Sequence, residues 1–373
     1  IARTASTRRT AAVAEDADGR RRQRVVLVAH SHVVGGIERH VVELAGGLRE
    51  RGHQVMFAGP LDGWLGESMV AAGHRCLHLP MHGMYDPWSA WRLARFCASE
   101  RASIVHGHAQ RGARYAAWAA RRAGVACVAT AHSTNAGKWF DASANVIAVS
   151  AAVRASLLAR GLPPAKVHVV HSGVRDLGAR APAVGRPGGA IALVMLSRLE
   201  RVKGHDLALQ AMREVGDRLP CRLLVFGPGD SDWARRLREL ADSLGVADRV
   251  EFRGATDDPG SALALADIVL APSRREALSL TLIEAASVQR AAIAADVGGI
   301  PEVVADGETG LLFPAGDAHA LAQAILRLGG DEALRARLAR AARERFEHAF
   351  TLDAMLEGTL RVYAIAACTT MSR

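Results

Sequence analysis

Short apolar runs alternate with segments of helical periodicity along most of this 373-residue chain. Continuous apolar runs of about four to eight residues are typical of buried strands in a parallel sheet, whereas apolar residues three or four positions apart indicate amphipathic helices. The alternation predicts an α/β fold built on doubly wound parallel sheets. The runs that we interpret as strands are 25–29, 54–59, 103–108, 125–131, 145–149 and 167–170 in the first half, and 190–196, 222–226, 249–253, 268–271, 291–295 and 309–313 in the second.

Helical periodicity follows most of these strands. The first helix repeats apolar residues from Ile37 to Leu48 and ends at Gly52, because glycine readily leaves the helical conformation. An arginine-rich and alanine-rich helix follows His108. Further helices are predicted from residue 205 onwards and over 232–244, 280–288, 321–328, 334–346 and 350–366.

Changes in composition divide the chain. Residues 1–24 are rich in Ala, Arg and Thr and lack apolar periodicity, which predicts a disordered basic tail. Residues 176–189 are rich in Gly, Pro, Ala and Arg, which predicts a linker between domains. We therefore expect an N-terminal domain at 25–175, a C-terminal domain at 190–349, and a final helix with a tail at 350–373.

Composition excludes a chain that is disordered throughout, because half of the residues are hydrophobic. The formal net charge is +9, and nearly all positive charge is arginine, since the only lysines are Lys138, Lys166 and Lys203. Arginine favours bidentate contacts with phosphate and carboxylate. Nucleotide phosphates, an anionic lipid surface and nucleic acid would all suit this balance, so charge alone does not choose among them.

Cysteine usage and hydropathy predict the compartment. The five cysteines lack the Cys-x-x-Cys spacing of a metal site and lie mostly within apolar runs, which predicts reduced, buried thiols. No apolar run is long enough to span a bilayer, and the first residues do not form the apolar centre of a secretory leader. We therefore expect a cytoplasmic protein.

The stretch from Ala271 to Glu302 contains the strongest candidates for chemistry. Glu276 follows a predicted strand, in a loop where a side chain can project into a crevice at the carboxyl end of the sheet. Glu284 lies one turn into the next helix, whose N-terminus is itself a site for an anion. Glu276 could accept hydrogen bonds from sugar hydroxyls, and Glu284 from a ribose. Thr281-x-x-Glu284 is equally the pattern of a capping box, in which Glu284 would only close the helix start.

A second loop carries two cations. Arg198 and Lys203 both follow the strand 190–196, and Gly204 comes directly before the next helix. Two cations at a helix N-terminus are unfavourable unless an anion binds there. We therefore interpret this loop as a phosphate site.

The N-terminal half offers a weaker phosphate motif and several histidines. Gly35 and Gly36 lie between a strand and a helix, which outlines a phosphate-binding turn without the Gly-x-Gly-x-x-Gly fingerprint of dinucleotide sites. His106, His108 and His132 end predicted strands, where a cleft is expected. A lone histidine is more often a hydrogen-bonded structural residue, and no carboxylate spacing completes a metal site.

The central stretch resembles the donor-site signature of the retaining family 4 glycosyltransferases, which have the GT-B fold. That signature is a glutamate, seven residues, a second glutamate before alanine, and then Asp-x-Gly-Gly-x-Pro-Glu. Here it is Glu276, Glu284-Ala285 and residues 296–302, and flanking motifs match in order over residues 25–365. The chain departs from the signature at Ala277, Ser279, Gln289 and Ala291, where the family usually has Gly, Gly, Gly and Pro.

The resemblance implies a fold and a set of roles. Two Rossmann-like domains would face a cleft, the first binding the acceptor, and the C-terminal helix would cross back to that first domain. Arg198 and Lys203 would hold a nucleotide diphosphate, Glu276 would orient the donor sugar, and His132 would lie near sugar and acceptor. The donor-binding residues implied are Gly35, Gly36, Arg198, Lys203, Gly227, Gly254, Glu276, Leu280, Thr281 and Glu284, and the catalytic residues implied are His132, Glu276, Arg198 and Lys203.

The leading hypothesis is therefore a retaining glycosyltransferase that moves a sugar from a nucleoside diphosphate to an acceptor hydroxyl. Attack would come from the front face, and the leaving phosphate would accept the proton of the acceptor. No metal or other cofactor is expected, because cations replace the metal. The acceptor would be a sugar or a lipid-linked sugar in cell-envelope polysaccharide or lipopolysaccharide synthesis, and no nucleic-acid partner is expected.

Alternatives remain open at this point. A GT-B sugar-nucleotide epimerase would use the same fold, whereas a phosphorylase needs an anchoring lysine in a chain poor in lysine. A non-catalytic carbohydrate-binding protein of this fold would explain the altered signature positions. Peripheral contact with an anionic membrane and a plain solvated surface would both explain the basic tail and the arginines after His108, which are Arg111, Arg114, Arg121 and Arg122.

Overall fold

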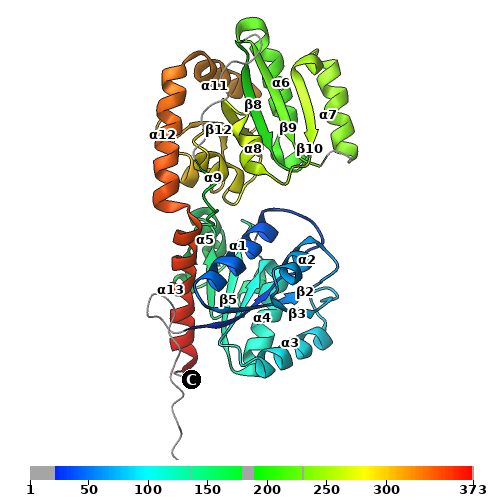
Figure 1. The fold of residues 1–373 in the computed structure, drawn as a ribbon, viewed down its shortest axis with the longest axis vertical. Helices are drawn as coiled ribbons and strands as arrows, with labels where there is room; N and C mark the ends of the chain where they lie inside the picture. Colours follow the sequence, from blue (N-terminus) through cyan, green and yellow to red (C-terminus); the bar gives the residue numbers. More distant parts are fainter. Residues whose placement is uncertain (1–21, 136, 179–188, 229–230, 372–373) are drawn as a thin grey trace, which may run out of the picture.

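The computed structural model describes residues 22–135, 137–178, 189–228 and 231–371. They form two α/β domains, one above the other in Figure 1, with the C-terminal domain at the top. Most of the predicted tail (1–24) and most of the predicted linker (176–189) lie outside the described residues. Within the described part, no helix combines the length and the apolar character needed to cross a bilayer.

The N-terminal domain is built on a seven-stranded parallel sheet in the order β3-β2-β1-β4-β5-β6-β7. Its strands are β1 (Arg24–Val28), β2 (Gln54–Gly59), β3 (Arg75–His78), β4 (Ile104–His108), β5 (Ala126–Ala131), β6 (Asn145–Ala148) and β7 (Val167–Val169), and its helices are α1 (Gly36–Glu50), α2 (Trp64–Ala71), α3 (Pro87–Ser99), α4 (Ala109–Ala123) and α5 (Ala151–Ala159).

The C-terminal domain repeats this design with a six-stranded parallel sheet in the order β10-β9-β8-β11-β12-β13. Its strands are β8 (Ile191–Leu196), β9 (Cys221–Phe226), β10 (Val250–Gly254), β11 (Ile268–Ala271), β12 (Ala291–Asp296) and β13 (Leu311–Pro314), and its helices are α6 (His205–Val215), α7 (Asp232–Ser243), α8 (Pro259–Ala264), α9 (Leu280–Ser287), α10 (Ile300–Val303), α11 (Ala318–Gly330) and α12 (Glu332–Ala349).

The predicted pair of doubly wound α/β domains is confirmed, and the predicted strands match observed ones within a few residues. The strand β3 and the helices α2 and α3 that flank it were not predicted, and neither were the short helices α5, α8 and α10. The four residues of β3 read Arg-Cys-Leu-His and are half-buried or exposed at the sheet edge, so they form no continuous apolar run. Edge strands of this kind lack the signal by which buried strands are found.

Strand order reverses between β1 and β4 in the first sheet and between β8 and β11 in the second. Ligands of doubly wound folds bind at such switch points, outside the carboxyl ends of the strands. The loop after β1 carries Gly35, the loop after β8 carries Arg198 and Lys203, and the loop after β11 carries Glu276. Each candidate loop therefore lies at the functional edge of its own sheet.

The final helix α13 (Leu352–Met371) runs back along the N-terminal domain, as Figure 1 shows in red. Leu356 and Tyr363 are buried in the same apolar cluster as β1 and α1. A Cβ at Gly47 of α1 would lie 2.5 Å from Leu356 Cδ1, so a larger residue there would require the Leu356 side chain to move. The predicted return of the C-terminal helix to the N-terminal domain is confirmed.

A carboxylate from the C-terminal domain caps a helix of the N-terminal domain. Glu302 of α10 accepts hydrogen bonds from the backbone amides of Ala151 (2.7 Å) and Ala152 (3.0 Å), the first residues of α5. The same carboxylate lies 2.8 Å from His171 Nε2. Because the N-terminus of a helix carries partial positive charge and unpaired N–H groups, this contact fixes α10 onto α5.

The glycine pair of the central stretch packs directly on the loop that holds Glu276. Gly298 has φ +58°, and a Cβ there would lie 1.8 Å from the Glu276 carbonyl oxygen. A Cβ at Gly299 would lie 2.1 Å from the Ala277 carbonyl oxygen. Only two consecutive glycines allow this approach, which positions Glu276 at the carboxyl end of β11.

Replacing Glu302 with alanine should lower the free energy of unfolding by about 0.5–2 kcal/mol, because the amides of Ala151 and Ala152 lose their acceptor. Urea or thermal unfolding measures the change. Glu308→Ala is the matched control, since Glu308 is an exposed carboxylate six residues away and its loss should change stability by less than about 0.5 kcal/mol. A Glu302→Ala chain as stable as this control would contradict the capping role.

Gly298→Ala and Gly307→Ala separate backbone strain from close packing. Both glycines have positive φ, but a Cβ at Gly307 (φ +71°) meets no atom within 4 Å. Gly307→Ala should therefore cost only about 1 kcal/mol for its left-handed backbone. Gly298→Ala should cost about 1–3 kcal/mol more, because its Cβ overlaps the Glu276 loop. Equal losses in unfolding experiments would show that the packing against Glu276 is unimportant.

Candidate active site

The loops after β8 and β11 interlock. Gly204 has φ +73° and ends the loop of Arg198 and Lys203, and a Cβ there would lie 1.9 Å from the Pro272 carbonyl oxygen. Lys203 Nζ lies 2.6 Å from Glu276 Oε2, and both side chains are largely buried. Two of the predicted catalytic residues are thus in direct contact, on loops that pack against each other.

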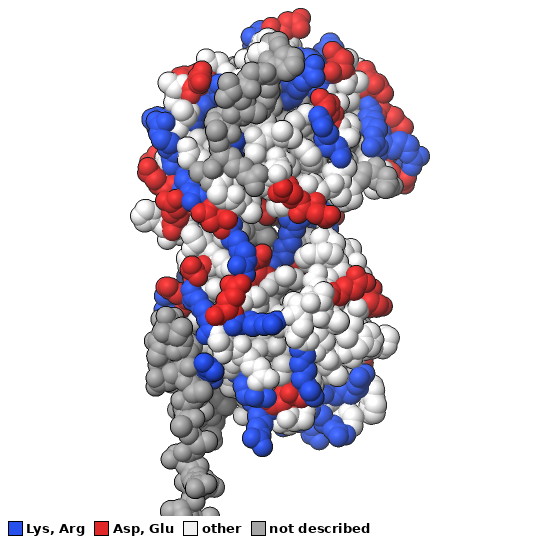
Figure 2. Space-filling view, viewed as in Figure 1, with Lys and Arg blue, Asp and Glu red and all other residues white. Residues whose placement is uncertain are grey.

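Arg198 lies on the same loop but faces the other domain. Its guanidinium contacts Glu200 (NH1 to Oε1, 2.8 Å) and is nearly half exposed. A Cβ at Gly35 would lie 3.9 Å from Arg198 Nε, and one at Gly36 would lie 3.4 Å from Leu280 Cδ1. The predicted glycine pair of the N-terminal domain therefore lies opposite Arg198 and the start of α9. Figure 2 shows basic and acidic side chains bordering the groove between the two domains.

The start of α9 is free of a side-chain cap. Ser279, the residue before the helix, has φ +103° and makes no capping hydrogen bond. Thr281 Oγ1 donates to the Leu196 carbonyl oxygen at the end of β8 (2.9 Å), so it ties α9 to the sheet. The capping-box interpretation of Thr281 and Glu284 is therefore wrong. The first N–H groups of α9 are left for a ligand at the edge where Gly36 faces Leu280.

Glu284 is buried at the domain interface. Its Oε1 lies 3.6 Å from Arg39 NH1, which belongs to α1 of the N-terminal domain. Burial raises the pKa of the Glu284 carboxyl to about 7, although Arg39 acts in the opposite direction. Near neutral pH this group can therefore exist as an acid or as a carboxylate, depending on what binds beside it.

Gly227 and Gly254 lie together on the other side of the cationic loop. The Gly227 amide donates to the Gly254 carbonyl oxygen (2.7 Å). A Cβ at Gly227 would lie 2.1 Å from the Ser197 carbonyl oxygen, whereas one at Gly254 would meet nothing within 4 Å. Gly227 is thus a packing residue of the loop, and Gly254 is the one whose backbone is open to a ligand.

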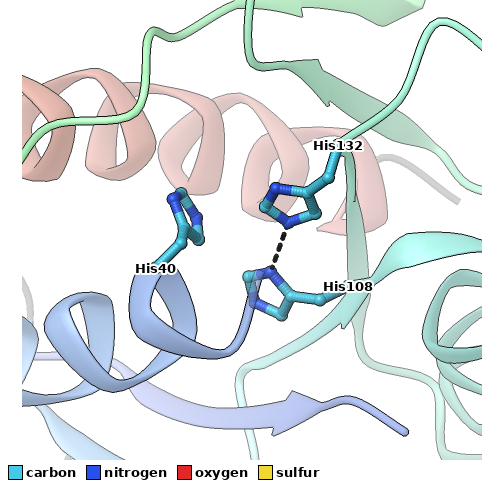
Figure 3. A group of neighbouring side chains, drawn as sticks. All are labelled: His40, His108 and His132. Carbon is cyan, nitrogen blue, oxygen red and sulfur yellow. Dashed lines mark hydrogen bonds between the residues drawn. The ribbon is translucent and has the colours of Figure 1, made fainter. Parts of the chain in front are cut away.

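His132 belongs to a cluster of histidines in the N-terminal domain, shown in Figure 3. It lies at the end of β5 beside His108 from β4, with His132 Nε2 3.2 Å from His108 Nδ1. His40 from α1 completes the group, with its ring centroid 4.7 Å from that of His132. Burial lowers the pKa of His40 to about 4 and holds that of His132 well below its usual range, so the imidazoles are neutral at pH 7.

These three histidines are the group of described residues that could hold a metal ion. One nitrogen from each lies within 4.8 Å of the other two. Neutral imidazole is a preferred ligand of zinc, but the group brings no carboxylate or thiolate. His106 lies next to them, and both of its nitrogens are used, by Tyr363 (2.8 Å) and Thr130 (2.7 Å), as expected for a structural histidine.

The predicted residues thus form two groups. Arg198, Lys203, Glu276 and the start of α9 converge with the glycine pair of the other domain, whereas no contact among the described residues joins His132 to them. His132 is instead linked through His40, which lies one turn after Gly36 on α1. The sequence analysis missed Arg39, His40 and Glu302 in these contacts. Arg39 and His40 come three and four residues after Gly36, one turn into α1, and this spacing could have indicated that they lie near the glycine pair.

Positions that depart from the family signature keep an unusual backbone. Ser279 has φ +103° and Gln289 has φ +58°, and both are positions where the signature has glycine. Left-handed conformations are unfavourable for residues with a side chain. The chain therefore follows a glycine-like path at both ends of α9 although glycine is absent.

Both halves of the chain match family profiles. Residues 34–176 match Glycosyltransferase Family 4, and residues 181–345 match Glycosyl transferases group 1. Among solved structures, HepE of Anabaena in complex with UDP and glucose has the same fold, with a TM-score of 0.81 at 19% identity, covering 92% of this chain and 99% of that one. The GT-B fold is thereby confirmed.

Curated relatives match over most of their length. The phosphatidyl-myo-inositol mannosyltransferase of Mycobacterium leprae is 29% identical over 363 residues, covering 90% of this chain and 94% of the relative. The D-inositol 3-phosphate glycosyltransferase of Streptomyces avermitilis is 31% identical over 368 residues, covering 88% of this chain and 76% of the relative. With this identity across both domains, the chain belongs to the family 4, group 1 glycosyltransferases.

Proposed function

We propose that this glycosyltransferase takes a nucleoside-diphosphate sugar as its donor and transfers the sugar with retention of configuration. The observation that carries the proposal is the convergence of Arg198, the Lys203–Glu276 pair and the open start of α9, opposite Gly35-Gly36 of the other domain. Cations and unpaired N–H groups at one edge suit a diphosphate, and the carboxylate suits sugar hydroxyls.

The leaving group explains why these groups gather. Departure of a nucleoside diphosphate places negative charge on its terminal phosphate. Arg198, Lys203 and the N–H groups of α9 are fixed before the reaction and stabilise that charge as it develops, which is usually the largest contribution to catalysis. In the retaining reaction proposed, the acceptor attacks from the face of the leaving phosphate, which takes the acceptor's proton. No metal ion is required in this scheme.

The Lys203–Glu276 ion pair keeps both groups in place before the donor arrives. When the donor binds, Lys203 can turn its remaining N–H groups to the phosphates while Glu276 accepts from the sugar hydroxyls. Glu284 and Arg39 would bind the ribose from the two domains, and Gly254 would leave room for the base. His132 would reach the sugar and the acceptor once the domains close.

Donor and acceptor classes are supported by the relatives. HepE was crystallised with UDP-glucose, and the two curated relatives are named for a mannosyl transfer to phosphatidyl-myo-inositol and a glycosyl transfer to D-inositol 3-phosphate. We propose a sugar, a cyclitol or a lipid-linked polyol as acceptor. With such an acceptor, the enzyme would act in cell-envelope synthesis, in the cytoplasm or at the inner membrane surface.

A non-catalytic binding protein is the second candidate, because the signature is altered at Ser279 and Gln289. The backbone at both residues keeps the positive φ that glycine would adopt. Retaining such strain favours an intact donor site, since strained residues persist mainly where function holds them. An enzyme is therefore the better proposal.

Lys203→Met and Arg198→Met should each lower turnover about 100- to 1,000-fold, because each removes a charge that stabilises the leaving diphosphate. Release of nucleoside diphosphate from UDP-, GDP- and ADP-sugars measures the rate, after a thermal-shift screen has identified the preferred donor. Arg201→Met is the matched control on the same loop, since the Arg201 guanidinium stacks on Trp233 (4.5 Å). It should leave the rate within about threefold of the unmodified chain.

Two outcomes would contradict this proposal. One is unchanged turnover in Lys203→Met and Arg198→Met under conditions where the unmodified chain is active. The other is a chain that binds nucleotide sugars but releases no diphosphate from any of the three donor classes, which would favour the binding protein.

Nucleotide binding should release a proton from Glu284. In the unliganded protein the Glu284 carboxyl has a pKa of about 7, and ribose hydroxyls donate more strongly to its ionised form. Affinity should therefore weaken as pH falls below about 7, by up to about tenfold per pH unit. Titration calorimetry in two buffers of different ionisation enthalpy measures the proton, and Glu284→Gln should abolish both effects.

The same variant tests the pKa itself without a ligand. A carboxyl whose pKa is raised on folding lowers stability as pH rises from about 4.5 to about 7, because the unfolded chain loses the proton first. Glu284→Gln should thus be more stable than the unmodified chain near pH 8, by about 3 kcal/mol at most, and the gain should vanish toward about pH 4.5. If Glu284→Gln gains stability but nucleotide binding to the unmodified chain releases no proton, the raised pKa would stand and only the ribose role of Glu284 would be contradicted.

A further inference from the structure

A cavity of about 330 Å³ lies in the N-terminal domain at the carboxyl ends of β1, β2 and β3. Its wall includes His30 and His32 from the loop after β1, Pro60 after β2, His78 at the end of β3, and Arg111 from α4. The same β1 loop continues into the glycine pair that faces the C-terminal domain. The cavity therefore lies at the functional edge of the sheet, next to the proposed donor site.

Arg111 brings an unbalanced charge into this cavity. Its NH1 donates to His30 Nε2 (2.5 Å) and to the Met81 carbonyl oxygen (3.4 Å). Burial and the charge of Arg111 lower the pKa of His30, so its partner is a neutral ring. Asp62, the acid in the wall, lies 3.8 Å from His32, and no carboxylate of the described residues forms an ion pair with Arg111. A half-buried cation without a counter-charge is unfavourable.

Arg114, three residues further along α4, shows how the fold satisfies a structural arginine. Its Nε donates to the Met84 carbonyl oxygen (2.5 Å). Its guanidinium carbon lies 4.0 to 4.5 Å from the ring centroids of Tyr85, Trp118 and Trp139. Cation–π contacts with three rings balance its charge. Among the described residues Arg111 has no such cation–π contact and no acidic partner, so its charge in the cavity is not balanced by the protein.

We propose that this cavity binds a phosphate group of the acceptor substrate, with Arg111 as the anchoring cation. The proposal rests on the transferase function proposed above and specifies its acceptor. The guanidinium fork matches two phosphate oxygens. His78 Nδ1 accepts from the Leu61 amide (3.2 Å), so its proton lies on Nε2 as a further donor. An uncharged sugar in the cavity would leave Arg111 unbalanced.

The phosphate could belong to a soluble phosphorylated polyol or to a phospholipid headgroup, and the experiment separates the two. The full chain is first saturated with UDP, so that the donor site is filled and cannot take up added phosphate. Calorimetric titrations with inorganic phosphate and with D-inositol 3-phosphate, and co-sedimentation with phosphatidylinositol vesicles, then measure binding. Unphosphorylated inositol and phosphatidylcholine vesicles are the neutral controls.

Arg111→Met should weaken binding of whichever phosphate probe binds by at least tenfold, because charge-assisted hydrogen bonds are lost. Arg111→Lys keeps the charge but loses the two-pronged guanidinium, so its affinity for the probe should lie between those of Arg111→Met and the unmodified chain. Arg122→Met, at an exposed position of the same helix, should bind like the unmodified chain. Binding of D-inositol 3-phosphate alone would identify a soluble acceptor, and binding of the vesicles alone a lipid headgroup. Either result supports the proposal if it depends on Arg111.

Two results would overturn the proposal: no binding of any phosphate probe, or equal binding by Arg111→Met and the unmodified chain. Thermal unfolding of each variant shows whether the Met81 segment has lost its support, and Arg111→Lys still tests the fork if Arg111→Met does not fold. A chain that fails to bind UDP or other nucleotides would contradict the donor proposal instead. The dependence on Arg111 is measured in the same titrations whether or not nucleotide binds.

Discussion

The two sheets are held together by an apolar cluster that both domains share and by one carboxylate that accepts hydrogen bonds from backbone amides of the other domain. Glu302 lies at the end of the signature stretch, and its partners are the first amides of α5. Ser150, in the same domain as α5, caps only the Val153 amide, so the Ala151 and Ala152 amides are left for this anion. The contact holds α10 against α5. Candidate residues more than 160 positions apart, such as Gly35 and Arg198, lie opposite each other across the groove.

The proposed donor side is a set of loops that support one another rather than a single motif. Gly204 allows the loop of Arg198 and Lys203 to pack on the Pro272 carbonyl, and Gly298 allows the loop after β12 to pack on the Glu276 carbonyl. An ion pair between Lys203 and Glu276 joins the loop after β8 to the loop after β11. Side chains held in this way lose little freedom when a ligand binds, which favours preorganised stabilisation of charge. Toward the phosphates, the N-terminal domain presents the backbone of the glycine pair, whereas its Arg39 lies beside Glu284 at the proposed ribose site.

Most of the fold could be predicted because buried parallel strands carry a continuous apolar signal, which is weaker in the edge strands β7 and β10 and was too weak to find in the edge strand β3. The placement of Arg198 and Glu276 after their strands could be predicted in the same way. Contacts could not. Lys203 and Glu276 are 73 residues apart and meet because β8 and β11 are neighbours, an order that no local pattern encodes. The histidine cluster likewise depends on α1 crossing the ends of β4 and β5.

The N-terminal domain cannot complete its hydrophobic core from its own half of the chain. Leu356, Leu360 and Tyr363 of α13 are buried in the cluster that surrounds β1 and α1, whereas the cluster around β8 and β9 draws only on residues between 191 and 339. The ribosome synthesises α13 after both sheets. The domain that is translated first can therefore complete its core only after the C-terminal domain has been synthesised.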